Sequence, residues 1–193
     1  MSKLITISGL DGSGKSTQIE MLKNYLKSQG KSFYYFHAIK FSIANICRRR
    51  TSTTEKSVVK ANWLQIQLRK VALLIDVCRF GRLLKKLKVD YIISDRYFYN
   101  SAVNINYLSG KNKKLFAERF IPKPDLVFYL KVSPQIIMQR ERKPDQGMEY
   151  LIEKEKIFSD KIKEWDMVIL DGEREKGEIF DDLKLSFSSS AKA

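Results

Sequence analysis

Residues 9–16 read Gly9-Leu10-Asp11-Gly12-Ser13-Gly14-Lys15-Ser16 and match the pattern G-x-x-x-x-G-K-[ST] at every position. In such a loop the glycines permit a tight turn, and consecutive backbone N–H groups then point at one phosphate. A helix that begins directly after the loop adds the positive end of its dipole. The pattern therefore predicts a phosphate-binding loop (P-loop) for ATP or GTP. Lys15 is expected to contact the β- and γ-phosphates, and the Ser16 hydroxyl is expected to bind Mg²⁺.

The segments on both sides of the loop have the periodicity that this interpretation requires. Residues 4–8 form an apolar, β-branched run that is typical of a buried strand. From Lys15 onward the apolar residues Ile19, Leu22 and Leu26 recur on one face of a predicted helix. A chance glycine-rich turn would have no reason to lie between a strand and a helix, so the phosphate-binding interpretation is favoured.

Four further apolar segments predict strands, and they cover residues 32–36, 91–94, 126–132 and 167–170. Three segments with helical spacing of apolar residues cover residues 63–87, 151–165 and 176–185. Strands alternate with helices, and the central strands are apolar on both faces. This order predicts an α/β fold with a five-stranded parallel sheet flanked by helices in three layers. No internal repeat or linker divides the chain, so residues 1–193 are expected to form a single domain.

The composition favours an anionic ligand and a cytoplasmic location. The chain carries 36 Lys and Arg against 22 Asp and Glu, a net charge of +14, which raises the local concentration of anions. The basic residues are spread along the whole chain, as in a solvated lysine-rich surface. No apolar run is long enough to cross a membrane, and Met1-Ser2-Lys3 leads directly into the first predicted strand, so no signal peptide is expected. Cys47 and Cys78 lack metal-ligand spacing and are expected to be buried or half-buried free thiols in a reducing compartment.

A second candidate site lies at the end of the predicted strand over residues 91–94. Asp95 follows this strand directly, and Arg96 and Tyr97 come next. A P-loop protein places a carboxylate that faces Mg²⁺ at such a strand end. A strand-end Asp can also cap a helix or a turn. The guanidinium next to the carboxylate suits a site with two phosphate-bearing ligands, so Asp95 is expected to bind the metal with Ser16, directly or through water.

Several motifs resemble the thymidylate kinase family of P-loop nucleoside monophosphate kinases. They are Gly9 to Thr17, Asp95-Arg96-Tyr97 with Ser101 beyond it, Pro122-Lys123-Pro124-Asp125-Leu126, and Leu170-Asp171-Gly172. The resemblance covers nearly the whole chain. It implies a nucleoside monophosphate kinase fold, MgATP as phosphoryl donor, a deoxynucleoside monophosphate as acceptor, above all dTMP, and a homodimer.

The resemblance also implies roles for individual residues. ATP would be bound by Gly9, Leu10, Asp11, Gly12, Ser13, Gly14, Lys15, Ser16, Thr17 and Arg140. The acceptor would be bound by Asp11, Lys40, Arg79, Arg96 and Ser101, with Arg96 on its phosphate and Arg79 on its base. A lid over residues 139–150 would place Arg140 against adenine and Arg142 over the transferring group. Lys15, Asp95, Arg96, Arg140 and Arg142 would therefore be the catalytic residues.

Three positions depart from the family pattern. Lys40 is the cation nearest to the place where the family has a second acceptor-phosphate arginine, and it lacks the guanidinium fork. Ile75 stands four residues before Arg79, where the family often has an aromatic ring that stacks on thymine. Gln146 lies in the lid where the family often has arginine. These differences concern base specificity rather than the phosphate chemistry.

The type of acceptor can be argued from an absence in the sequence. A kinase that phosphorylates a hydroxyl benefits from a carboxylate base after the second strand, whereas a phosphate acceptor is already anionic. Between Lys31 and Thr54 the chain has no acidic residue, which favours a monophosphate acceptor. A P-loop kinase for another small phosphorylated acceptor, a weakly active relative and an NTPase stimulated by nucleic acid remain alternatives. Nucleic acid is disfavoured because no separate basic domain is present, and a solvated helix end is favoured for Arg48-Arg49-Arg50.

Overall fold

Five parallel strands form one sheet in the order β2-β3-β1-β4-β5. The strands are β1 (Lys3–Gly9), β2 (Phe33–His37), β3 (Tyr91–Asp95), β4 (Leu126–Lys131) and β5 (Val168–Asp171). The computed structural model describes residues 2–44, 61–141 and 143–190, without the side chains of residues 188–190. The expectations for Cys47, for Arg48-Arg49-Arg50 and for Arg142 fall outside the described residues. The expectation that Cys78 is buried or half-buried is wrong, because its thiol is free and lies on an exposed position of the helix over residues 63–86.

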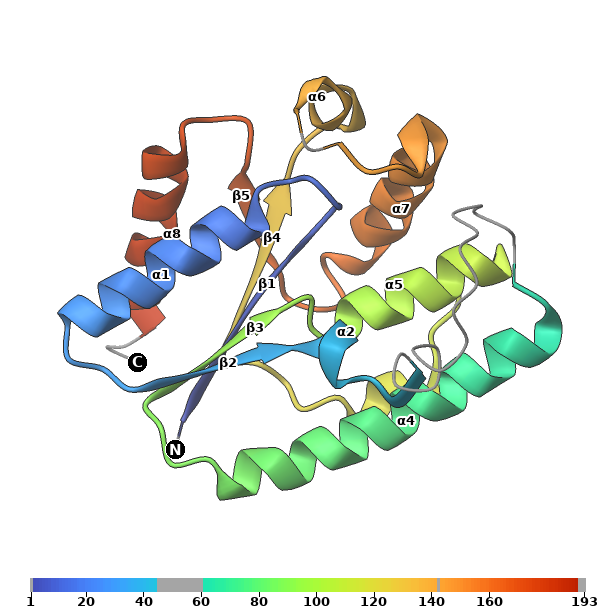
Figure 1. Cartoon of the computed structure of the whole chain (residues 1–193), viewed down its shortest axis with the longest axis horizontal. Coiled ribbons are helices and arrows are strands. Elements are labelled where there is room, and N and C mark those ends of the chain that lie inside the picture. The colour runs from blue at the N-terminus through green and yellow to red at the C-terminus, as the bar shows by residue number, and fades with distance from the viewer. Residues whose placement is uncertain (1, 45–60, 142, 191–193) are drawn as a thin grey trace.

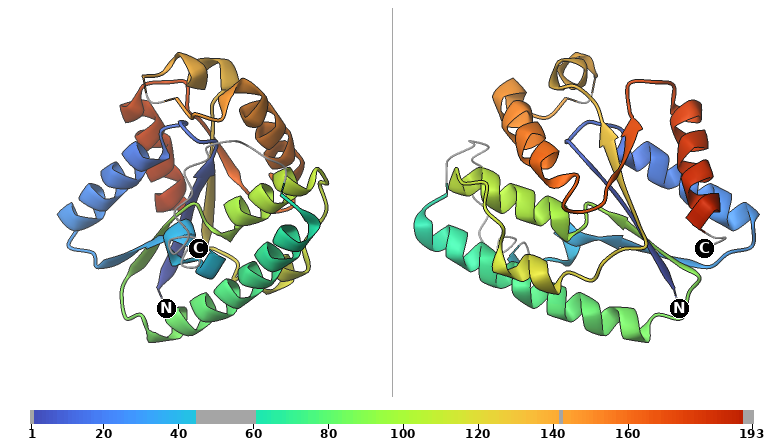
Figure 2. Two further views of the ribbon diagram at one scale, coloured as in Figure 1. Left: turned by 45° about the vertical axis from the view of Figure 1, so that its right-hand side comes forward. Right: turned by 180° about the vertical axis from the view of Figure 1, so that it is seen from behind.

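Helices cover both faces of the sheet (Figure 1). On one face lie α1 (Lys15–Ser28) and α8 (Lys176–Ser190), which pack against each other. The other face carries α4 (Trp63–Lys86), α5 (Phe98–Ser109) and α7 (Gly147–Lys161). Shorter elements are α2 (Ala38–Phe41), η1 (Phe116–Phe120) and α6 (Pro134–Gln139). The two views in Figure 2 show the same three layers, so the predicted α/β architecture is confirmed.

Alternation along the strands divides the core into two parts. Ile5 and Ile7 of β1 are fully buried in a cluster with residues of α1 and α8. Leu4 belongs to the other cluster, which contains residues of α4, α5 and α7. Successive side chains of a strand point to opposite faces, so a central strand with apolar residues on both faces requires helices on both sides.

Most predicted elements are confirmed with small shifts at their ends. The long helix continues through Gly81 as predicted, and α8 runs to Ser190, beyond the expected end at residue 185. α7 ends at Lys161, so Trp165 lies after this helix rather than in it. The sequence pattern did not reveal α5, because apolar residues occupy so many of its positions that no single helical face stands out.

The parallel order brings the carboxyl ends of the strands to one edge. β1 lies between β3 and β4, and the register places His37 and Ile7 beside Asp95. In doubly wound α/β proteins, ligands bind at this edge, where neighbouring strands connect to opposite faces. The β1–α1 loop lies here close to α6 and to the start of α7 (Figure 1).

Candidate active site

The β1–α1 loop has the conformation that its glycines predict. Gly9 has φ +148°, and a Cβ atom there would lie 2.8 Å from the Leu130 carbonyl oxygen and 2.9 Å from Ser13 Oγ. Gly14 has φ +99° and forms the N-cap of α1 without a side-chain cap hydrogen bond. The first turn of α1 contains no acidic residue, so its backbone N–H groups and helix dipole are suited to an anion.

Lys15 lies folded over this loop. Its side chain is buried, and Nζ donates hydrogen bonds to the Leu10 carbonyl oxygen at 2.5 Å and to Ser13 Oγ at 3.3 Å. Burial and then the positive charge of Arg96 lower the pKa of Lys15 to about 8, against the opposing effect of Asp11 and Asp95. Phosphate oxygens carry full charge and are stronger acceptors than the carbonyl and hydroxyl that Lys15 now contacts. The ammonium is therefore placed to bind donor phosphates.

Asp11 connects three separate parts of the chain. Its Oδ1 lies 2.7 Å from Arg96 Nη2, and its Oδ2 accepts a hydrogen bond from Tyr150 Oη at 2.6 Å. Lys154 Nζ donates to Tyr150 Oη at 2.5 Å and lies 3.9 Å from Asp11 Oδ2. Burial alone would raise the pKa of Asp11, but the charges of Lys154, Arg96 and Lys15 hold it below its ordinary value. Asp11 is thus an ionised link between the P-loop, the β3–α5 turn and α7.

Arg96 is held in an uncommon backbone conformation. Its φ is +52°, in the left-handed region that residues other than glycine rarely occupy. This conformation follows β3 directly and brings the guanidinium to Asp11. Backbone strain of this kind persists where the surroundings fix it, and it is enriched at functional sites.

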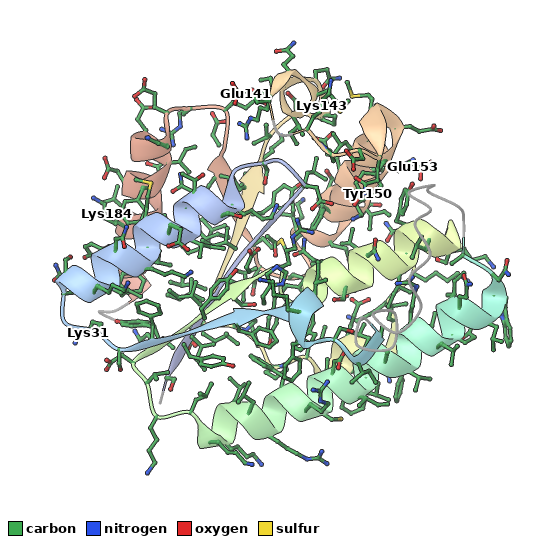
Figure 3. The ribbon with its side chains drawn as sticks, in the orientation of Figure 1. Lys31, Glu141, Lys143, Tyr150, Glu153 and Lys184 are labelled. Atoms are coloured by element: carbon green, nitrogen blue, oxygen red, sulfur yellow. The ribbon has the colours of Figure 1, made fainter. Side chains whose placement is uncertain are left out.

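A cavity of about 360 Å³ lies beside the P-loop, with walls from α4, α5 and α7. Asp11 and Arg96 line it next to the loop, and Ser101, Tyr150 and Lys154 line it from the two helices. Figure 3 labels Tyr150 on α7, the helix whose side chains reach the P-loop. The volume of this cavity is within the range of small-molecule sites.

The structure brings together only some of the predicted acceptor residues. Asp11, Arg96 and Ser101 line the cavity, whereas Lys40 is exposed on α2 and is not in its described wall. Arg79 is not in that wall either, because its Nη1 donates to Asp76 Oδ1 at 2.8 Å and to the Phe41 carbonyl oxygen at 3.1 Å. Asp76 does line the cavity, so Arg79 contacts a residue of the wall without lining the cavity itself.

Arg140 lies against the P-loop at the end of α6. Its Nη1 donates to the Gly12 carbonyl oxygen at 2.8 Å, and its Nη2 donates to the Gly172 carbonyl oxygen at 3.1 Å. The guanidinium therefore joins the P-loop to the turn after β5, on the donor side. Its packing against adenine stays a prediction.

The residues expected to hold Mg²⁺ fit that ion. Asp95 Oδ2 accepts a hydrogen bond from Tyr35 Oη at 3.1 Å, while Oδ1 is buried and has no hydrogen-bond partner among the described residues. Ser16 lies in the first turn of α1 with an exposed side chain. Mg²⁺ prefers hard oxygen ligands and takes few of them from protein, because it keeps several waters and binds substrate phosphates. A hydroxyl and an unpaired carboxylate oxygen meet this requirement.

Several residues of the cavity wall were missed in the sequence, among them Arg69 of α4 and Asn100 of α5. Two more, Tyr150 and Lys154, contact Asp11 of the P-loop. Their spacing of four residues places them on one face of α7, which a helical pattern can show. Tyr150 and Asp11 are 139 positions apart in the sequence, so no local pattern can predict that they are in contact.

The lowered pKa of Lys154 leads to a testable pH dependence. Burial, and then Arg96, lower this pKa to about 8, against the opposing effect of Asp11. An unfolded Lys titrates near pH 10.4, so between about pH 8 and 10 the unfolded chain binds more protons and stability rises with pH. We expect the unliganded protein to melt at higher temperature as the pH rises through this window, and Lys154→Met to show a smaller rise. Thermal unfolding followed by circular dichroism measures both, and identical slopes would contradict this assignment.

No helix in the described parts of the chain is both long and apolar enough to span a membrane.

Comparisons with known proteins agree with this geometry. A family model for thymidylate kinases matches residues 7–178. The chain is 27% identical over 190 residues to a probable thymidylate kinase 1 of Saccharolobus solfataricus, with 94% of both chains covered. It is 26% identical over 202 residues to a thymidylate kinase of Francisella tularensis, with 87% of this chain and 86% of that one covered. The structure of the Candida albicans thymidylate kinase shares the fold with a TM-score of 0.71 at 19% identity, over 98% of this chain and 92% of that one. Because the family match spans the P-loop, the Asp95-Arg96 segment and most of the sheet, the chain belongs to the thymidylate kinase family.

Proposed function

We propose that this protein transfers the γ-phosphoryl group of MgATP to dTMP and releases ADP and dTDP. The observation that carries the proposal is the 2.7 Å contact between Arg96 and Asp11 of the P-loop, at the wall of the cavity. A phosphate bound by Arg96 would therefore lie next to a γ-phosphate bound by the P-loop. Membership of the thymidylate kinase family supports dTMP as the acceptor.

In the proposed mechanism the protein positions two phosphates and neutralises their charge. The P-loop backbone, the start of α1 and Lys15 hold the donor phosphates, and Arg96 orients the acceptor phosphate by two parallel N–H bonds. The attacking acceptor oxygen is already anionic and needs no base. Mg²⁺, held by Ser16 and Asp95, would offset charge on the donor oxygens. Arg140 and Arg142 are proposed to offset charge that develops on transfer, the former through its place on the P-loop.

The alternative acceptors differ mainly in their bases. Ile75, expected to stand where the family often has a ring that stacks on thymine, is exposed on α4 and is not in the described cavity wall. No aromatic ring is therefore supplied from this position, and another phosphorylated acceptor of similar size remains the second candidate. A cavity lined by α5 and α7 beside the P-loop fits a small molecule better than a nucleic acid. An NTPase stimulated by nucleic acid is therefore not favoured.

The test is an acceptor panel. The purified protein is incubated with MgATP and each common ribo- and deoxynucleoside monophosphate in turn, and both ADP and the diphosphate product are measured. We expect dTMP to give the highest kcat/KM. A clear preference for a different monophosphate would keep the mechanism and replace the acceptor, whereas ADP release that no monophosphate stimulates would exclude the proposed function.

We also propose that residues 1–193 act as one cytoplasmic kinase domain whose lid is residues 139–150, and that two copies form a homodimer. The dimer would use an exposed apolar face of α4, which consists of Trp63, Leu64, Leu68, Val71 and Ile75. A contiguous exposed face of five large apolar side chains suits a protein interface.

The proposed dimer can be tested by adding charge to this face. Because an interface disfavours an unpaired buried charge, Leu68→Glu is expected to convert the dimer into a monomer with little change in thermal stability. Light scattering after size-exclusion chromatography measures the mass, and Lys85→Glu at the exposed end of α4 is the control. A wild-type protein that is already monomeric at micromolar concentration would rule out this dimer.

A further inference from the structure

Lys154 is a cation in the wall of the cavity that the family pattern did not assign. It lies on α7 with a side chain that is only 12% exposed. Tyr150 lies one helical turn before it and also lines the cavity (Figure 3). The ammonium is therefore directed at the cavity rather than at bulk solvent.

The hydrogen bonds of Lys154 are incomplete within the described parts of the chain. Its Nζ donates to Tyr150 Oη at 2.5 Å, and Asp11 Oδ2 at 3.9 Å is beyond hydrogen-bond distance. An ammonium has three N–H groups, so two of them have no described hydrogen-bond acceptor. Burial of a charged donor costs free energy unless an acceptor satisfies it. Anionic oxygens in the cavity would supply that acceptor.

The excess of positive charge around Asp11 also favours binding of an anion. Lys15, Arg96 and Lys154 all act on this single carboxylate. The positive charge of Arg96 opposes protonation of Lys154, which shows that the two cations repel each other. A phosphate that contacts both would relieve this repulsion and the unsatisfied donors at once.

We propose that Lys154 binds the phosphate group of the acceptor nucleotide from α7, together with Arg96, as the second cation of the acceptor-phosphate site. This inference rests on the proposed function. It assigns to Lys154 the role that the sequence suggested for Lys40, which is exposed on α2 and is not part of the described cavity wall. Tyr150 acts as a positioning residue, because its hydroxyl holds the ammonium and is itself held by Asp11.

The test compares Lys154→Met with Lys156→Met, which removes an exposed lysine from the same helix. Loss of a hydrogen bond to a charged group corresponds to about a 10–100-fold change in an equilibrium constant. We expect kcat/KM for dTMP to fall by about this factor in Lys154→Met, mainly through KM, while KM for MgATP stays within about threefold. Lys156→Met is expected to match wild type, and Lys154→Arg is expected to restore most of the dTMP affinity.

A melting curve separates binding from a structural role. A lysine retained for stability would lower the melting temperature when replaced, whereas a buried cation with unfilled donors is expected to leave it unchanged or raise it at pH 7. An active wild type with equal KM for dTMP in Lys154→Met would overturn the inference alone. A wild type that phosphorylates no monophosphate would overturn both the proposed function and this inference.

Discussion

Lys15→Met is expected to reduce kcat by about 10²–10³-fold, because it removes a preorganised cation from the donor phosphates. Lys15 is buried against the P-loop, and its Nζ donates hydrogen bonds to the Leu10 carbonyl oxygen and to Ser13 Oγ. Methionine has a similar length and no charge, so the loop keeps its packing while the charge is lost. The measurement is steady-state turnover of dTMP with MgATP.

The control for this variant is Lys27→Met, which removes an exposed lysine from the same helix. It is expected to match wild type. Because burial lowers the pKa of Lys15, its removal is not expected to destabilise the unliganded protein at pH 7. A Lys15→Met protein that keeps wild-type kcat would show that this lysine does not contact the transferring group.

Arg96→Ala is expected to lower kcat/KM for dTMP by about 10²–10⁴-fold. Two charge-assisted hydrogen bonds to a phosphate contribute roughly 3–6 kcal/mol together, which corresponds to this range. Asp11 keeps its hydrogen bond from Tyr150, and Arg140 keeps its hydrogen bond to the Gly12 carbonyl oxygen, so the P-loop stays anchored. KM for MgATP is therefore expected to change little.

Two further variants make the Arg96 prediction specific. Lys at position 96 keeps the charge and loses the planar fork, so Arg96→Lys is expected to fall between Arg96→Ala and wild type. Both variants share the left-handed backbone at this position, and the cost of that conformation therefore cancels in their comparison. Arg82→Ala, on the exposed side of α4, should have wild-type kinetics. Normal kcat/KM for dTMP in Arg96→Ala would remove Arg96 from the acceptor site.

The P-loop and the residues at the end of β3 could be predicted because their conformation depends mainly on residues that are close in the sequence. Gly9 and Gly14 have the positive φ values that the tight turn of the loop itself requires, so the sequence motif was sufficient to predict them. The close approach of Gly9 to the Leu130 carbonyl oxygen comes from the pairing of β1 with β4 and is therefore a tertiary contact. Asp95 is the last residue of β3 and Arg96 follows it directly, so a strand pattern was sufficient to place them at the edge of the sheet. α5 escaped prediction because it is apolar beyond one face.

The sequence by itself determined the P-loop, the alternation of strands and helices, and the family, since each depends on residues that are close together in the chain. Only the tertiary structure decided which distant cations meet at Asp11. The sheet order and the packing of α7 on α5 bring Lys154 into the cavity wall, while α2 leaves Lys40 exposed. The positions of Lys40 and Lys154 in the sequence do not show which of the two lysines lines the cavity. The packing of whole helices and strands determines this, rather than the conformation of any one segment.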